Sequence, residues 1–258
     1  MNSTEKRKYM SSIIMNMLSD HGFFVKNGSV WKLNRENEYV FNIQFFLGRS
    51  GDLNDIAVYF GSFFSPIKES SNRSLGLFLG NGIELNYYLR NSGIKKGLLQ
   101  YGVPFESQVN EIMPYFNEII LPLIVSNNSL DEYLEKAWEL SRMQIKSCAG
   151  IPSGVNVYEF ISAYLAINMP QKSVAIAEEY ASCCKYAAEH IRTNRDIYYY
   201  NNEMQVTEWM NSYYATIEII KNIQNGNVKA ILEDAKSKEH QSIETCKKYF
   251  RKHFDEST

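Results

Sequence analysis

Alternating apolar and polar positions mark residues 22–62 as the most strongly patterned part of the chain. Phe23–Lys26 and Ser29–Asn34 are short runs rich in aromatic and β-branched residues, joined by Asn27-Gly28. An Asn-Gly pair tolerates the positive φ angles of a two-residue turn, so these runs predict a β-hairpin. Residues 35–38 form a second polar turn before the next run.

The next run, Tyr39–Leu47, alternates with a period of two. One face carries only apolar side chains, and the opposite face includes Asn42 and Gln44. After turn-forming residues at 48–54, a second alternating run continues the apolar face. This period predicts half-buried antiparallel strands. The face expected to be buried carries Phe41, Ile43, Phe45, Ile56, Val58 and Phe60.

An open sheet cannot leave an apolar face in water, and a helix upstream can cover it. Apolar residues recur at helical spacing within residues 6–20, and Gly22 suits the left-handed position that follows a helix. We therefore expect Ile13, Met17 and Leu18 to lie over the sheet.

Several short motifs in this region are shared with a known family. They are Gly22-Phe23, Lys26, Trp31, Phe41-Asn42-Ile43-Gln44 and Val58-Tyr59-Phe60-Gly61. In these residues, over roughly the first half of the chain, the sequence resembles the bacterial domain-of-unknown-function family four-three-zero-four. The resemblance implies an α+β fold and assigns no activity.

The pattern is weaker between residues 63 and 102. Short apolar runs at residues 75–79 and 83–89 predict two further strands, with Gly80-Asn81-Gly82 as a hairpin turn between them. The two glycines also begin a dinucleotide-binding fingerprint. Because Leu85 stands where its third glycine would be, the turn is the favoured interpretation.

From Glu106 onward the period becomes helical. An apolar stripe runs through residues 112–123, where Pro114 would be tolerated only near a helix start. Ser129, followed by Glu132, is a capping box that starts another helix. The Gly- and Pro-containing residues 150–154 are the best linker candidate. Four further helices are predicted at residues 155–167, 171–192, 204–223 and 227–250.

These patterns predict an α+β fold: an N-terminal helix packed on an antiparallel β-sheet, followed by an all-helical C-terminal region of antiparallel helix pairs. We expect a sheet domain at 1–104 and a helical domain at 105–258. Residues 173–179 and 228–234 share an alanine, an isoleucine and two acids at an offset of 55. The helix pairs are weakly similar to tetratricopeptide hairpins, although that repeat is about 34 residues long and its consensus is absent.

Composition narrows the class of protein. Of 258 residues, 45% are hydrophobic and 22% charged, as in ordinary folded soluble proteins, and the aromatic share of 14% is high. The net charge of −2 argues against a nucleic-acid or anionic-membrane partner. Residues 1–104 carry 12 Lys and Arg against 8 Asp and Glu, and residues 105–258 carry 15 against 21, so the net charge changes from +4 to −6.

Cysteine spacing and hydropathy suggest a compartment. The four cysteines lack the spacing of a disulfide framework or a zinc site. The polar N-terminal residues are not followed by the apolar run of a signal peptide, and no run approaches the roughly 20 apolar residues of a spanning helix. We therefore expect a cytoplasmic protein.

The sequence contains no recognisable catalytic or metal-binding motif. His240 and Glu244 stand one helical turn apart without a third ligand, so no metal site is predicted. The acid pairs Glu178-Glu179 and Glu233-Asp234 are interpreted as solvated helix faces. A favourable interaction with the helix dipole accounts for the cations Lys247, Lys248, Arg251 and Lys252. We expect no catalytic residue and no cofactor.

These features favour a non-catalytic protein-binding or regulatory protein of bacterial type. A toxin-neutralising immunity role is one concrete version, suggested by the kind of gene that such families accompany. The alternative is an enzyme, a hydrolase or nuclease whose site assembles from distant residues.

The candidate binding surface is the second face of the sheet, where Lys32, Asn42, Gln44 and Tyr59 should be neighbours. Tyr59 would supply an aromatic anchor there and the amides would set the register. Plain solvation of this face is the competing interpretation. Tyr198-Tyr199-Tyr200, between helix pairs, is either packed down or displayed for a partner.

Overall fold

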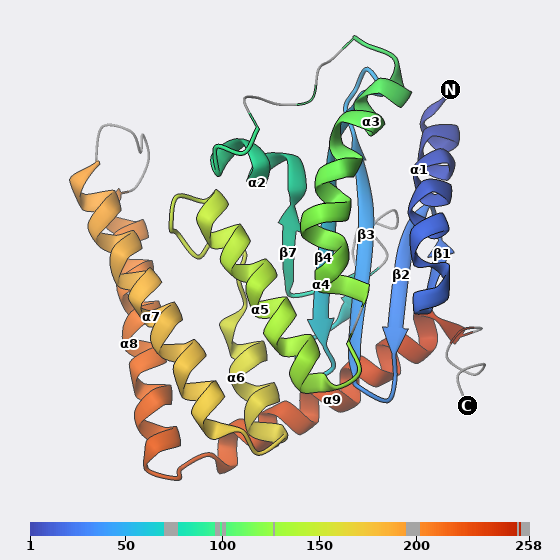
Figure 1. Cartoon of the computed structure of the whole chain (residues 1–258). Coiled ribbons are helices and arrows are strands. Elements are labelled where there is room, and N and C mark those ends of the chain that lie inside the picture. The colour runs from blue at the N-terminus through green and yellow to red at the C-terminus, as the bar shows by residue number, and fades with distance from the viewer. Residues whose placement is uncertain are drawn as a thin grey trace.

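The computed structural model describes residues 1–69, 77–95, 99, 102–125, 127–194, 202–251 and 253. The fold is α+β, with a five-stranded antiparallel sheet, an N-terminal helix and a helical C-terminal region (Figure 1). The strand order is β1-β2-β3-β4-β7. Within the described ranges, no helix is long and apolar enough to cross a membrane.

The elements have the following bounds. The sheet contains β1 (Phe23–Lys26), β2 (Ser29–Asn34), β3 (Tyr39–Leu47), β4 (Leu53–Ser62) and β7 (Asn81–Glu84), and a separate ribbon contains β5 (Lys68–Glu69) and β6 (Leu77–Phe78). The first helical segments are α1 (Ser3–Leu18), η1 (Ser19–His21), α2 (Leu85–Asn91), α3 (Phe105–Tyr115), η2 (Phe116–Ile120) and α4 (Leu121–Val125). The later helices are α5 (Leu130–Ser147), α6 (Val157–Ala166), α7 (Pro170–Thr193), α8 (Asn202–Gln224) and α9 (Lys229–Tyr249).

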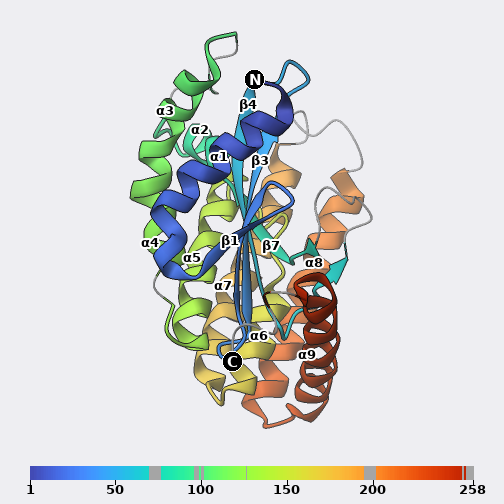
Figure 2. The same ribbon diagram turned by 90° about the vertical axis from the view of Figure 1, so that its right-hand side faces the viewer.

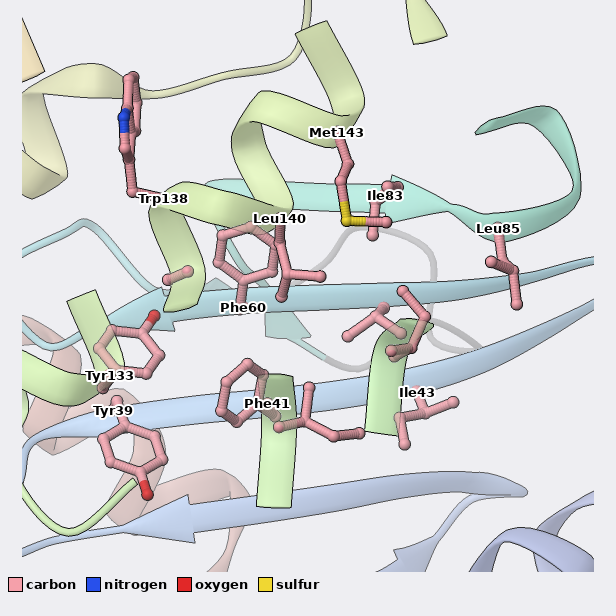
Figure 3. Close-up of a cluster of buried hydrophobic side chains, with 14 of the residues drawn as sticks. Tyr39, Phe41, Ile43, Phe60, Ile83, Leu85, Tyr133, Trp138, Leu140 and Met143 are labelled. Atoms are coloured by element: carbon pink, nitrogen blue, oxygen red, sulfur yellow. The ribbon is translucent and has the colours of Figure 1, made fainter. Parts of the chain in front are cut away.

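The front face of the sheet, which carries Phe41, Ile43 and Phe60, is buried beneath α1, α3, α4 and α5 (Figures 1 and 2). Figure 3 shows side chains of α5, among them Leu140 and Met143, against those of the strands. All six residues predicted for this face are at most 4% exposed and belong to one core cluster. Leu18, Ile13 and Met17 of α1 pack in the same cluster, so this prediction is confirmed.

The back face of the sheet, which carries Trp31, Asn42 and Tyr59, is also covered. Helix α9 runs behind the strands toward β1 (Figures 1 and 2), and its Cys246 joins Phe250 in a cluster with Trp31. The ring centroids of Trp31 and Phe250 are 5.2 Å apart. The expectation of a half-buried strand is therefore wrong for β3, whose residues 39–45 are all buried. The last helix supplies a second covering layer.

The predicted hairpin turn at Gly80-Asn81-Gly82 is wrong. Strand β6 pairs with β5, whereas β7 pairs with β4 and becomes the edge of the main sheet. Asn81 and Gly82 therefore lie within a strand, and Gly80 is the point at which the chain passes from one sheet to the other.

The strand expected at residues 83–89 ends at Glu84, where α2 begins. Asp55 of β4 accepts hydrogen bonds from the backbone nitrogens of Asn86 (2.7 Å) and Tyr87 (3.0 Å). These nitrogens belong to the first turn of α2 and have no partner within the helix. The carboxylate of Asp55 thus stabilises the start of α2, where the N-cap residue Glu84 makes no side-chain hydrogen bond to the helix.

Two predicted helix boundaries are present. Gly22 follows the turn after α1 with a φ of 75°, in the left-handed region. Ser129 Oγ accepts a hydrogen bond from the backbone nitrogen of Glu132 (3.2 Å). The Glu132 carboxylate reaches back to the backbone nitrogen of Asn128 (2.8 Å), one residue before the position that a capping box uses.

Pro114 lies near the end of α3, so the expectation that it marks a helix start is wrong. The chain continues without a break into η2, a π-helical segment, and then into α4. Proline cannot donate an intrahelical hydrogen bond, and a π-helical turn accommodates such a gap in the ladder. Phe116 and Ile120 remain buried, so the apolar stripe is preserved.

The four C-terminal helices are present, but their pairing differs from the expectation for the last two. Helix α6 packs on α7, α8 runs back along α7, and α9 contacts α6 and β5 (Figure 1). One core cluster extends from Met10 to Ala235, so the core is continuous across the boundary drawn at 104/105 and across residues 150–154. Tyr198-Tyr199-Tyr200 lies outside the described residues.

Candidate functional site

The structure places three of the four residues of the predicted binding surface on one face of the sheet and Lys32 on the other. Trp31, Asn42, Tyr59 and Gly82 form one cross-strand row on the back face. Lys32 pairs with a front-face residue and lies on the opposite side of the sheet. Placing Lys32 beside the other three was therefore wrong, because the register of β2 puts Trp31 opposite Asn42.

The Lys32 side chain is buried on the front face. Its Nζ lies 5.4 Å from the ring centroid of Phe23 and 5.7 Å from that of Tyr39. Burial, followed by the charge of Lys136, lowers the pKa of Lys32. The aromatic rings stabilise the ammonium through cation–π attraction.

Asn42 and Gln44 share the back face, but they are buried, at 0% and 6% exposed. Gln44 Nε2 donates to Asn42 Oδ1 (2.6 Å), and Asn42 Nδ2 donates to the backbone oxygen of Val30 (3.2 Å). The amides therefore bind each other and the backbone. The expectation that they form a solvated or displayed surface is wrong.

Tyr59 differs from these amides because its ring extends over the edge strand. A Cβ atom at Gly82 would lie 2.4 Å from Tyr59 Cδ1, so only glycine leaves room for the ring there. Burial, followed by the charges of Glu84 and Asp55, raises the pKa of Tyr59 to about 12. Tyr59 stays neutral and forms part of the wall of a cavity.

This cavity, which we call the edge cleft, has a volume of 610 Å³ and follows the outer edge of β7. Its opposite wall comes from α5, α7, α8 and the loop between α5 and α6. Among the described strands, β7 pairs with β4 alone. The cleft is lined by Tyr59, Pro66, Leu79, Gly80, Asn81, Gly82, Ile83, Glu84, Gln144, Pro152, Gly154, Val155, Asn156, Tyr180 and Trp209.

A polar wall closes one side of the edge cleft. Asn81 Oδ1 accepts a hydrogen bond from the backbone nitrogen of Asn156 (2.7 Å), and Asn81 Nδ2 donates to Glu159 Oε2 (2.7 Å). A Cβ atom at Gly80 would lie 3.1 Å from both Asn156 Nδ2 and Ser65 Oγ. These contacts fix the loop after α5 against the start of β7.

Glu159 of α6 lies behind this wall and is 1% exposed. Burial raises the pKa of this carboxyl to about 7, and the hydrogen bonds from the backbone of Ser62 and from Asn81 oppose the shift. Such a pKa suits a general acid or base. However, Glu159 does not line the cleft, and its contacts join α6 to β4 and β7. Its position indicates a structural role.

Sequence reasoning missed both Glu159 and the cleft. The available signal for Glu159 was a lone acid in the apolar run of α6, where an ionisable residue needs a buried partner. No comparable signal exists for the cleft, because its walls come from segments far apart in the chain.

A second cavity of 620 Å³ lies on the other side of the α5–α6 loop. It shares Trp209 with the edge cleft and contains charges of both signs, from Lys146 and Glu208. Cys148, a free thiol, also lines it. The loop between the cavities has positive φ angles at Gly150 (86°) and Gly154 (73°), which allow it to turn sharply.

The other candidate residues have structural contacts. Glu179 is partly exposed, and its carboxylate also accepts hydrogen bonds from Trp138 Nε1 (2.8 Å) and Arg142 Nε (2.9 Å). Lys247 pairs with Glu244 (2.8 Å) and Lys248 with Glu69 (2.7 Å), so ion pairs as well as the dipole hold these cations. The part of the chain that the structure describes contains no group of three residues suited to a metal ion.

No protein-family model matches the chain, and neither the curated proteins nor the solved structures include a significant match. The resemblance to the domain-of-unknown-function family therefore remains a prediction.

Proposed function

We propose that this protein is a non-catalytic binding protein that takes up an extended segment of another protein in the edge cleft. The observation that supports the proposal most directly is a 610 Å³ cleft along β7, which lies at the edge of the sheet among the strands that the structure describes. In an antiparallel strand, every second residue directs its backbone N–H and C=O groups away from its neighbour. An extended segment can pair with such groups and extend the sheet.

The lining of the cleft suits a peptide. Backbone pairing gives affinity that is independent of sequence, and side-chain pockets give specificity. Val155 and Pro66 provide apolar wall, and Tyr59, Tyr180 and Trp209 provide aromatic side chains of the kind that dominates binding energies at interfaces.

Selection from an unbiased library of 12-residue peptides tests the proposal. The matched variants are Val155→Trp, which introduces an indole side chain inside the edge cleft, and Ser153→Trp, which introduces the same side chain in the second cavity. We expect selected peptides to bind the wild type and Ser153→Trp equally, and to lose at least about tenfold in affinity to Val155→Trp. Hydrogen exchange of the backbone amides of β7 should slow in the complex.

Two outcomes would contradict the proposal. One is the recovery of no binding peptide, and the other is equal binding to both tryptophan variants. Thermal melts of both variants provide the check that each is folded.

A further inference from the structure

The charge at the edge cleft is of one sign. Among the described residues that line it, Glu84 is the one charged side chain, and it is exposed. Asp55 lies close enough that both acids act on the neighbouring Tyr59, where their charges add to burial in raising the pKa of the phenol. The second cavity differs because Lys146 offsets Glu208 there. The edge cleft therefore favours a cation and opposes an anion.

Aromatic rings surround the same space. Tyr59, Tyr180 and Trp209 come from the sheet, α7 and α8, and all three line the cleft. The face of an aromatic ring attracts an ammonium or guanidinium group, most strongly where water is partly excluded. An acid combined with several rings is the arrangement by which proteins hold basic side chains.

We propose that the segment bound in the edge cleft carries a lysine or arginine side chain, whose cation lies between Glu84 and the aromatic rings. The inference rests on the proposed function and specifies the charge of the segment. The backbone of the segment pairs with β7, and its basic side chain projects onto the back-face side of the strand, where Glu84 and Tyr59 lie on neighbouring strands.

The peptides selected from the unbiased library provide the test. We expect one position to be enriched in lysine or arginine. Replacing that residue by norleucine should weaken binding to the wild type by about tenfold, since a partly desolvated cation–π contact and an ion pair act together. When binding is measured to the Glu84→Gln variant, replacing the basic residue of the peptide by norleucine should reduce the affinity by a clearly smaller factor. Glu208→Gln, the same change in the second cavity, is the control and should behave as the wild type.

The outcomes separate this inference from the proposed function. Selected peptides that bind in the cleft without a basic preference would overturn the inference and leave the proposed function standing. If Val155→Trp fails to block binding, both are overturned. If N-acetyl-lysine methylamide alone binds as tightly as the selected peptides, the site holds a small amine and the segment is excluded. Sedimentation that shows a dimer blocked by Val155→Trp would assign the cleft to a second copy of this chain and overturn the inference.

Discussion

The two faces of the central sheet are built from the same strands but are buried in different ways. The front face packs against several helices from the first two thirds of the chain. It holds Lys32 on β2 and Glu159 beside β4 and β7. The back face is covered partly by α9 and holds the amide pair Asn42 and Gln44. Lys32 and Glu159 are ionisable, whereas Asn42 and Gln44 are neutral amides that hydrogen-bond each other. The back face also carries one buried acid, Asp55, farther along β4.

This difference shows that a polar residue in a strand of alternating pattern does not always indicate a solvent-exposed face of the sheet. An amide pair can be buried at low cost when each group finds a hydrogen bond, whereas a buried carboxyl shifts its pKa. The stability should consequently respond to pH through Glu159 and not through the amide pair of Asn42 and Gln44.

The largest effect is expected on the front face. Ile43→Asp places a carboxylate among apolar side chains at a position that is 0% exposed, and should lower the free energy of unfolding by more than about 4 kcal/mol. Chemical denaturation monitored by circular dichroism measures it. Val25→Asp, on a strand position that is 46% exposed, is the control and should have little effect. Similar losses for both would show that the assigned register is wrong.

The next effect concerns the helix that covers the back face. Phe250→Ala removes a fully buried ring that contacts Trp31 and Phe24, so we expect a loss of about 3–4 kcal/mol. Urea unfolding measures the loss, and Tyr214→Ala on α8, where the side chain is 61% exposed, is the control. A loss below that of the control would mean that α9 does not hold the back face.

A pH-dependent effect is expected from Glu159. Its carboxyl has a pKa of about 7 in the folded protein, against an ordinary value of 4.5. The folded state therefore binds this proton more tightly, and the resulting stability is complete below pH 4.5 and is lost as the pH rises through 7. Relative to Glu159→Gln, the wild type should lose about 3 kcal/mol between pH 4.5 and pH 8.

Denaturation of both proteins across this pH range provides the measurement. Asp55 and Glu38 also have pKa values raised by burial, but they are present in both proteins and cancel in the difference. A difference that stays constant with pH would show that Glu159 is ionised throughout.

The smallest effect is expected at the amide pair. Asn42→Leu removes the hydrogen bonds that Asn42 makes with Gln44 Nε2 and with the backbone oxygen of Val30, which should cost about 1–3 kcal/mol. Unlike the effect of Glu159, this loss should be the same at pH 5 and pH 8, because no group involved titrates between these values. Thermal melts at the two pH values measure it, and a pH-dependent loss would remove the contrast between Glu159 and the amide pair.

The local parts of the fold could be predicted from the sequence. The Asn27-Gly28 turn, the period of two in β3 and the helical spacing before Gly22 depend on neighbours in the chain. The hairpin of β1 and β2 and the front-face core follow from them, whereas the register of β2 on β3 does not. Whether the protein binds a partner or catalyses a reaction remains a prediction from these patterns.

Contacts between distant segments could not be predicted. The strand pattern around Asn42 is the same whether water or a helix covers it, and the covering helix is specified by residues near Phe250. The start of α2 depends on Asp55, which precedes it by a whole strand and a ribbon. The edge cleft is likewise lined by Tyr59, Val155 and Trp209, which are far apart in the sequence. Local periodicity cannot predict that such residues lie side by side.

The late position of α9 in the chain has a consequence for synthesis in the cell. A ribosome adds roughly 5–20 residues per second, so Trp31 waits on the order of 10–40 s before Phe250 exists to cover it. During that interval the back of a nascent sheet presents apolar side chains to the surrounding solution. Such a surface is a substrate for ribosome-associated chaperones, and the protein should depend on them until its final helix emerges from the exit tunnel.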